Sequence, residues 1–220
     1  VHHFSSARLH ARQRLTDSSQ GEHSSVVLRV VCPGTMHLHV ISALWILRVG
    51  SKIDREMSDA IYSNRVRRGQ DQRHTNRFAV GSLEPYLFNY RRWKEDGVRA
   101  VERLIEENKP ALFVSADLRN YFHNIDPSFL LDEEWMSIWS ATLFGEGLES
   151  AEDCAIHLLL ANALIKWSDN LAEELGLGTG HGGLPVGVTA SQVVGNIALM
   201  DFDRAVEAGV KPRFYGRYVD

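Results

Sequence analysis

Apolar residues recur at helical spacing through the first half of the chain. Residues 36–64 read MHLHVISALWILRVGSKIDREMSDAIYSN, in which apolar side chains stand three or four positions apart on both sides of Gly50. This pattern predicts two helices separated by a break at that glycine. Another helix is predicted from Gly97 to Asn108, ahead of Pro110, which cannot continue it. The apolar face of that helix consists of Val98, Val101, Leu104 and Ile105.

Two short apolar runs farther along the chain each end on a carboxylate. ALFVSAD, residues 111–117, is nearly continuous in apolar side chains, which is typical of a strand buried on both faces, and it ends on Asp117. RFYGRYVD, residues 213–220, is a similar stretch that ends on Asp220. A lone acid at the end of a strand usually caps the next turn or helix. Two such acids on adjacent strands, however, are a way to assemble a divalent-metal site.

Between these runs the chain is predicted to be helical over 127–143 and 151–175, and again from Thr189 with its apolar face toward a sheet. A glycine-rich turn, LGLGTGHGGLPVG, precedes the last of these helices. The G-x-G-x-x-G spacing of dinucleotide-binding loops is matched there by Gly178, Gly180 and Gly183. That motif must directly follow a strand, whereas a helix precedes it here. We therefore interpret the glycines as a turn whose backbone approaches a partner closely.

Composition and charge limit the classes of protein that the chain can represent. Its 220 residues, 44% of them hydrophobic, suffice for one large domain or two small ones. The net charge of -4 gives no global sign of nucleic-acid binding, but arginines and lysines crowd residues 65–94, with aromatic residues among them. This mixture suits a surface that faces nucleic acid or phosphate. The alternative is that the aromatics belong to the core and the arginines to a solvated face.

Cysteine usage and hydropathy give no sign of a disulfide framework, a zinc site or a membrane span. The two cysteines, Cys32 and Cys154, are far apart and lack metal-ligand spacing. The apolar stretch VISALWILRV is too short to cross a bilayer and contains Arg48. We expect a cytoplasmic protein that does not contact membranes. Residues 1–36 are expected to be a poorly ordered or non-native N-terminal segment.

Three segments resemble, in order and spacing, motifs A, B and C of reverse transcriptases, the RNA-directed DNA polymerases. They are SADLRNYFHNID, GGLPVGVTASQVVGNIAL and RFYGRYVD. The resemblance implies an α+β fold: a polymerase palm, in which an antiparallel sheet carries helices on one face, over 111–220, and partial, largely helical fingers over 37–110. Motif C of that family reads aromatic-x-Asp-Asp, so we expect a fragment that ends one residue before the second Asp and lacks the thumb.

The resemblance also assigns chemistry to individual residues. Asp117 and Asp220 would be the catalytic carboxylates that bind Mg²⁺ or Mn²⁺, with the Leu118 carbonyl as a further ligand, because hard oxygen ligands suit these ions. Phe122 stands where the family uses an aromatic ring to exclude the ribose 2′-hydroxyl, although one of Tyr121 and Phe122 is expected to be a core residue. The substrate-binding residues so implied are Phe122, Leu184, Pro185, Val186, Gly187 and Ser191.

The implied partners are dNTPs and nucleic acid, as RNA template and DNA product, and the oligomeric state stays open. The basic segment precedes motif A and would therefore belong to the fingers. There it would line the path of the nucleotide triphosphate and the template. Its candidate residues are Arg65, Arg67 and Arg68.

Motif B departs from the commoner Leu-Pro-Gln-Gly, because the apolar Val186 replaces the glutamine that contacts the incoming nucleotide. GLPVG is similar to the bacterial branch associated with abortive infection and antiphage defence, some of whose members need no conventional template. Two alternatives stay open. One is a catalytically degenerate palm that binds nucleic acid, and the other is a group II intron or retron enzyme. An Asp encoded after Asp220 favours an enzyme, and a non-acidic residue favours a binding module.

Overall fold

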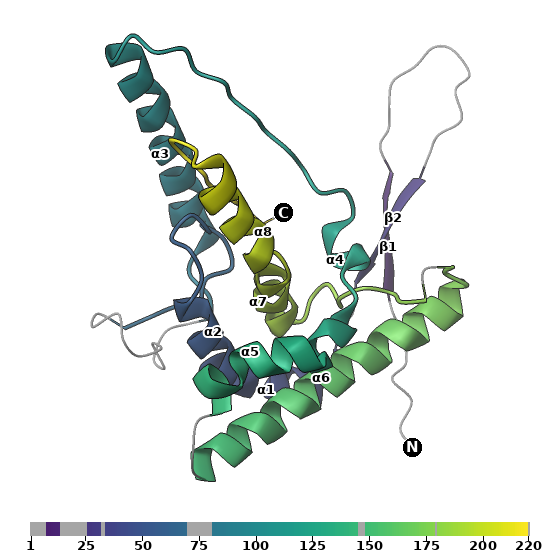
Figure 1. Ribbon diagram of the computed structural model, residues 1–220. Helices are drawn as coiled ribbons and strands as arrows, with labels where there is room; N and C mark the ends of the chain where they lie inside the picture. Colours follow the sequence, from purple (N-terminus) through teal and green to yellow (C-terminus); the bar gives the residue numbers. More distant parts are fainter. Residues whose placement is uncertain are drawn as a thin grey trace, which may run out of the picture.

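The computed structural model describes residues 8–13, 26–31, 34–69, 81–144, 148–178 and 180–219. These residues are largely helical (Figure 1). A hairpin of strands β1 (Arg8–Gln13) and β2 (Val26–Val31) pairs antiparallel at the beginning of the chain. The helical elements that follow are α1 (Met36–Trp45), the π-helix η1 (Ile46–Gly50), α2 (Ser51–Arg55), α3 (Tyr86–Glu106), α4 (Tyr121–Asn124), the 3-10 helix η2 (Pro127–Leu131), α5 (Glu133–Phe144), α6 (Leu148–Leu175), α7 (Thr189–Ala198), α8 (Met200–Ala205) and the π-helix η3 (Val206–Val210).

The hydrophobic core lies among α1, η1, α5, α6 and α7. α6 crosses the lower part of the molecule and contacts both α1 and α5 (Figure 1). α7 packs on α1 and η1 and is buried over most of its length. Side chains with almost no exposed surface are Trp45, Ile46, Ile53, Leu130, Leu143, Leu160, Leu164 and Val193. This packing fixes α7, the helix of motif B, at the centre of the described chain.

The helix does not break at Gly50, contrary to the prediction. α1, η1 and α2 follow one another without interruption, and Ser51 Oγ donates a hydrogen bond to the Leu47 carbonyl at 2.9 Å. Gly50 is needed for packing instead, because a Cβ there would lie 2.7 Å from Cζ3 of Trp45. The glycine therefore makes room for the indole ring without ending the helix.

The helices predicted over 127–143 and 151–175 are confirmed with changed bounds. The first is divided into η2 and α5 at Asp132, whose carboxylate accepts hydrogen bonds from the amides of Glu134 and Trp135. An aspartate whose side chain accepts hydrogen bonds from the first amides of a helix is a common N-cap. The second corresponds to α6.

α3 is longer than predicted and attached to the rest of the chain through its first half. It begins at Tyr86, well before Gly97, directly after Pro85. The face predicted to be apolar is not buried, since Val98 is 56% exposed and Ile105 is 70% exposed. The sequence pattern therefore located the helix but not the face that packs.

The expected palm sheet is wrong for the described residues. Residues 109–118 form an extended connection without regular secondary structure between α3 and α4, and Leu112 within it is 92% exposed (Figure 1). Residues 213–219 make one isolated parallel bridge, between Arg217 and Ile61, and no strand. A run of apolar residues becomes a strand only where another strand satisfies its backbone groups, and no described segment does this for 111–117. The helix from Thr189 accordingly packs on helices rather than on a sheet.

A buried histidine joins three helical elements of the core. His157 of α6 has no exposed surface, and its Nδ1 accepts a hydrogen bond from Trp45 Nε1 at 3.2 Å. Its Nε2 lies 2.9 Å from the Leu130 carbonyl, and its ring stacks on Trp135 with 5.3 Å between centroids. The neutral tautomer with the proton on Nε2 satisfies both nitrogens. Burial lowers the pKa of His157, and the bond to Leu130 opposes that shift.

The free energy of unfolding is expected to fall as the pH drops below about 6.5, because the unfolded chain then binds a proton that the buried His157 does not. This residue contributes a slope of at most about 1.4 kcal/mol per pH unit. Urea unfolding of the wild type and of His157→Gln between about pH 7 and pH 5 measures the contribution, since glutamine does not titrate. An identical pH dependence for the two proteins would contradict the assignment.

Candidate functional site

The segments that resemble motifs A and C both contact α7, the helix of the segment that resembles motif B. Tyr121 of α4 donates a hydrogen bond from its hydroxyl to the Gly195 carbonyl of α7. Arg217 donates from Nη2 to the carbonyl of Asn196, the next residue of α7, at 3.3 Å. The segments that contain Tyr121 and Arg217 therefore meet at two consecutive residues of α7, which itself belongs to the third segment.

The turn before α7 lies against α4. The Leu184 amide donates to the Phe122 carbonyl at 2.7 Å, which joins the motif B turn directly to motif A. Gly183 has φ of +80°, and a Cβ on it would lie 2.4 Å from Cα of His123. Backbone approaches backbone so closely there that no other residue fits. A close backbone approach thus occurs at Gly183, but against α4 of the same chain, and the predicted approach to a partner stays a prediction.

Replacing Gly183 with alanine is expected to lower the free energy of unfolding by about 3 kcal/mol, from the positive φ together with the clash against His123. Gly180 is a matched control, because its φ is +78° but nothing lies within 4 Å of an added Cβ. Gly180→Ala should cost about 1 kcal/mol, from the backbone conformation alone. Urea denaturation of both variants measures the difference, and equal losses would show that the contact with His123 is not rigid.

The remaining implied residues of motif B differ in their exposure. Leu184 and Pro185 are buried, Val186 is half-buried, and Gly187 is exposed with φ of +111°. Ser191 is buried, and its hydroxyl has no hydrogen-bond partner among the described residues. The hydrophobic part of the turn is therefore structural, and Val186 and Gly187 are the positions of this motif that solvent reaches.

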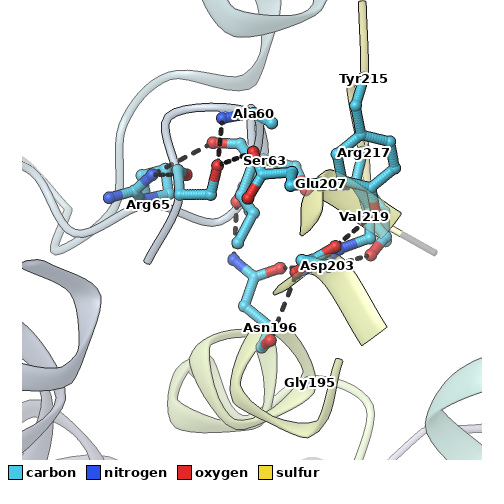
Figure 2. Close-up of polar contacts among 12 residues, drawn as sticks. Ala60, Ser63, Arg65, Gly195, Asn196, Asp203, Glu207, Tyr215, Arg217 and Val219 are labelled. Atoms are coloured by element: carbon cyan, nitrogen blue, oxygen red, sulfur yellow. Dashed lines mark hydrogen bonds and ion pairs between the residues drawn. The ribbon is translucent and has the colours of Figure 1, made fainter. Parts of the chain in front are cut away.

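A buried polar network holds the C-terminal segment on α7 and α8 (Figure 2). Arg217 donates from Nε and Nη2 to the two carboxylate oxygens of Asp203, at 2.9 and 2.8 Å. Its Nη1 donates to Asn196 Oδ1 at 2.9 Å and to the Val219 carbonyl at 3.1 Å. Asn196 Nδ2 in turn donates to the Ser63 carbonyl at 2.8 Å. The guanidinium thus links two helices and its own segment, and Asn196 extends the network to the loop after α2.

The charges of this network are enclosed by protein. The side chains of Arg217 and Asp203 are 5% and 2% exposed. The Tyr215 hydroxyl also donates to Asp203 Oδ1, and burial, followed by that bond, raises the pKa of Tyr215. A buried ion pair is tolerated when every carboxylate oxygen accepts a hydrogen bond. If either partner were removed, the other would be an uncompensated charge in the interior.

α3 is attached through aromatic contacts to the same segment. The Tyr218 ring contacts those of Tyr90 and Trp93, at centroid distances of 5.3 and 5.5 Å, and the latter two rings contact each other at 5.9 Å. Trp93 Nε1 donates to the Gly216 carbonyl at 3.0 Å, and the Tyr218 hydroxyl donates to the Tyr86 carbonyl at 3.1 Å. These three aromatic rings explain why α3 begins before the predicted residue.

The candidate metal ligands are only partly described. Asp117 is exposed at the end of the extended connection and makes no hydrogen bond or ion pair with a described residue, and Leu118 is 42% exposed. Asp220 lies outside the described residues, so the expected proximity of the two carboxylates stays a prediction. No group of three or more His, Cys, Asp or Glu residues that could hold a metal occurs in the described ranges. Two carboxylates and a carbonyl oxygen are ligands that suit Mg²⁺, because this ion binds one or two carboxylates and completes its coordination with water and phosphate.

Tyr121 and Phe122 differ in burial, and the role of Phe122 toward the ribose stays a prediction. Tyr121 is buried and is the core aromatic, whereas Phe122 is half-buried. The Phe122 ring packs edge-on against Tyr121, at 5.4 Å between centroids. A Cβ on Gly195 would lie 3.1 Å from Phe122 Cε1, so α7 supports the ring from behind. Phe122 therefore has a fixed position beside the motif B turn.

The candidate arginines of the basic segment have structural partners. Asp54 of α2 is fully buried and accepts from Arg65 Nε at 2.9 Å, from Arg68 Nη2 at 2.6 Å and from the Val66 amide at 3.1 Å. Arg67 is half-buried, and its amide donates to the Ser82 carbonyl at 2.9 Å. Arg65 and Arg68 thus order the loop after α2, and the contact of all three with substrate stays a prediction.

Two surface hollows of the described chain have no residue of the segment 115–126 in their lining. One of about 340 Å³ is lined by residues that include Asp59, Glu207, Arg213 and Tyr215, and one of about 240 Å³ adjoins it beside α8. The first hollow is lined in part by residues 212–215 of the C-terminal segment, and neither lining includes Phe122 or a residue of the turn before α7.

Comparison with known proteins adds no family. No helix in the described ranges combines the length and apolar character needed to cross a bilayer. No protein-family model, no curated protein and no solved structure matches this chain.

Proposed function

We propose that this chain carries the nucleotidyl-transfer site of an RNA-directed DNA polymerase. The observation that carries the proposal is the meeting of the three motif segments. The carbonyl of Phe122 accepts from Leu184 at 2.7 Å, and Arg217 binds Asn196. Motif order alone could arise by chance, but contacts that bring all three segments together favour one shared site.

In this proposal the carboxylates of Asp117 and Asp220, with the Leu118 carbonyl, hold Mg²⁺ or Mn²⁺. When bound, such ions activate the primer 3′-hydroxyl and stabilise the departing pyrophosphate. Phe122 excludes the ribose 2′-hydroxyl, because α7 behind it leaves the ring no room to retreat. Val186 and Gly187 face the incoming nucleotide from the motif B turn.

The first half of α3 is the best candidate for contact with nucleic acid. Arg91, Arg92 and Lys94 are exposed, and none of them pairs with a carboxylate of the described residues. Tyr86 and Phe88 are 67% and 72% exposed on the same stretch, in which no acidic residue occurs from 86 to 94, before Glu95 and Asp96. Cations that alternate with exposed rings suit single-stranded nucleic acid, where the rings stack on bases.

The test is incorporation of radiolabelled dNTPs by the full-length gene product in Mg²⁺ or Mn²⁺, with and without an RNA template and primer. Template-dependent incorporation supports an RNA-directed polymerase. Incorporation that ignores the template instead favours the branch associated with antiphage defence. Absence of incorporation under all these conditions would contradict the proposal.

A nucleic-acid-binding protein without catalysis is the second candidate. The exposed basic and aromatic residues of α3 favour it, as does Val186 in place of the usual glutamine. It predicts salt-sensitive binding of single-stranded RNA or DNA and no incorporation of dNTPs.

A further inference from the structure

Arg217 makes more hydrogen bonds than are needed to neutralise its charge. Its guanidinium is almost fully buried and bonds to Asp203, to both the side chain and the backbone of Asn196, and to the Val219 carbonyl. Its backbone is held as well, because its amide donates to the Ala60 carbonyl at 2.8 Å and its carbonyl accepts from Tyr62 at 3.0 Å. An ion pair with Asp203 alone would use only Nε and Nη2 of the guanidinium.

The contacts extend to the residue immediately before the second candidate carboxylate. The Val219 carbonyl accepts from Arg217 Nη1 at 3.1 Å, and the Val219 amide donates to Ser63 Oγ at 2.5 Å. Both backbone polar groups of Val219 are therefore hydrogen-bonded to other residues. Val219 also has φ of +69°, a conformation that a β-branched residue adopts only when its surroundings impose it.

We propose that Arg217 is a positioning residue, whose guanidinium fixes the backbone leading to Asp220 relative to the motif B helix. The inference rests on the proposed function, since it concerns the placement of a carboxylate which that function uses. Arg217 does not touch substrate in this account. It acts through Asn196 and Val219.

The planar fork of arginine is essential to this role. Nε and Nη2 bind the two oxygens of Asp203, which turns Nη1 toward Asn196 and Val219 at the same time. A lysine would keep the positive charge for Asp203 but has a single ammonium group, which cannot bridge all three partners. Arg217→Lys therefore separates the positioning role from charge neutralisation.

The experiment compares steady-state dNTP incorporation by the full-length gene product carrying Arg217→Lys with that of wild type. We expect kcat to fall roughly 100-fold, the effect of a misplacement of about 1 Å, with the KM for dNTP within about twofold of wild type. Arg213→Lys is the matched control, because Arg213 lies on the same segment but is exposed and pairs with Glu107. It should leave kcat unchanged. A kcat for Arg217→Lys equal to wild type would overturn the inference.

Hydrogen exchange gives a second readout that does not depend on activity. The Val219 amide should exchange faster in Arg217→Lys than in wild type, while peptides of α6 keep their protection. If Arg217→Lys does not fold, Asn196→Ala serves instead, since it removes one of the two Nη1 acceptors and leaves the pair with Asp203. Faster exchange at Val219 is again expected, and unchanged exchange overturns the inference. If wild type incorporates nothing, the proposed function fails, whereas this measurement still decides whether Arg217 anchors the segment.

Discussion

Replacing Asp117 with alanine is expected to lower dNTP incorporation by the full-length gene product by roughly 1000-fold or more, because the candidate site loses a carboxylate ligand of its metal ions. The fold should be unaffected. Asp117 is exposed and makes no hydrogen bond or ion pair with a described residue, and substitutions at such positions change the free energy of unfolding by about 0.5 kcal/mol or less. Initial rates of incorporation at saturating dNTP and Mg²⁺ measure the effect, with thermal unfolding in parallel.

Asp169→Ala is the control for that variant, since Asp169 is an exposed aspartate on α6 and belongs to none of the three motif segments. It should retain full incorporation. Equal rates for wild type and Asp117→Ala would remove Asp117 from the site. A large loss of thermal stability in Asp117→Ala would mean that the exposed connection has a structural role.

Asp203→Ala is expected to lower the free energy of unfolding by about 3–5 kcal/mol, because the buried guanidinium of Arg217 would be left without a counter-charge. The hydroxyl of Tyr215 would also lose its acceptor. Asp201 is a close control on the same helix. It is 93% exposed and pairs with Arg204 at 3.1 Å, so Asp201→Ala should cost less than about 1 kcal/mol.

Urea denaturation of wild type, Asp203→Ala and Asp201→Ala measures both values. A loss in Asp203→Ala as small as in Asp201→Ala would indicate that Arg217 rearranges to reach water. In that case the network of Figure 2 would be a weak surface contact rather than an anchor of the C-terminal segment.

The helices of the core could be predicted from the sequence because their apolar periodicity coincides with burial. α6 and α7 are the clearest cases: Leu160, Leu164, Val193 and Val194 recur at helical spacing and are buried. Gly50 shows where this logic fails. A glycine reads as a helix break, but here it accommodates the ring of Trp45.

The strand over 111–117 could not be judged from the sequence alone. An apolar run records a preference for burial, whereas a strand also needs a hydrogen-bonding neighbour. Leu112, Phe113 and Val114 have no such neighbour among the described residues and are exposed. The same limit applies to the C-terminal run, where Arg217 pairs with the loop at Ile61 and not with a strand.

The sequence predicted those residues of the candidate site that belong to a recognisable motif. It did not predict the residues that hold the site through buried charges and hydrogen bonds. Gly183 and Phe122 were identified from their motifs. The turn that contains Gly183 contacts α4, which contains Phe122. Asn196 and Asp203 were missed, although a signal existed. They fall in phase with Met200 on the buried face of their helices, and polar residues in an apolar register indicate a buried network.

The central claim is that Asp117 and Asp220 bind the same divalent ions, and Mn²⁺ binding tests it most directly. Electron paramagnetic resonance titrations would compare the full-length gene product with Asp117→Ala, with Asp220→Ala and with the double variant. If the carboxylates share the ions, each single variant loses most of the Mn²⁺ affinity and the double variant loses little more, because interacting ligands are not additive. Mn²⁺ affinity that is unchanged in either single variant would contradict the account.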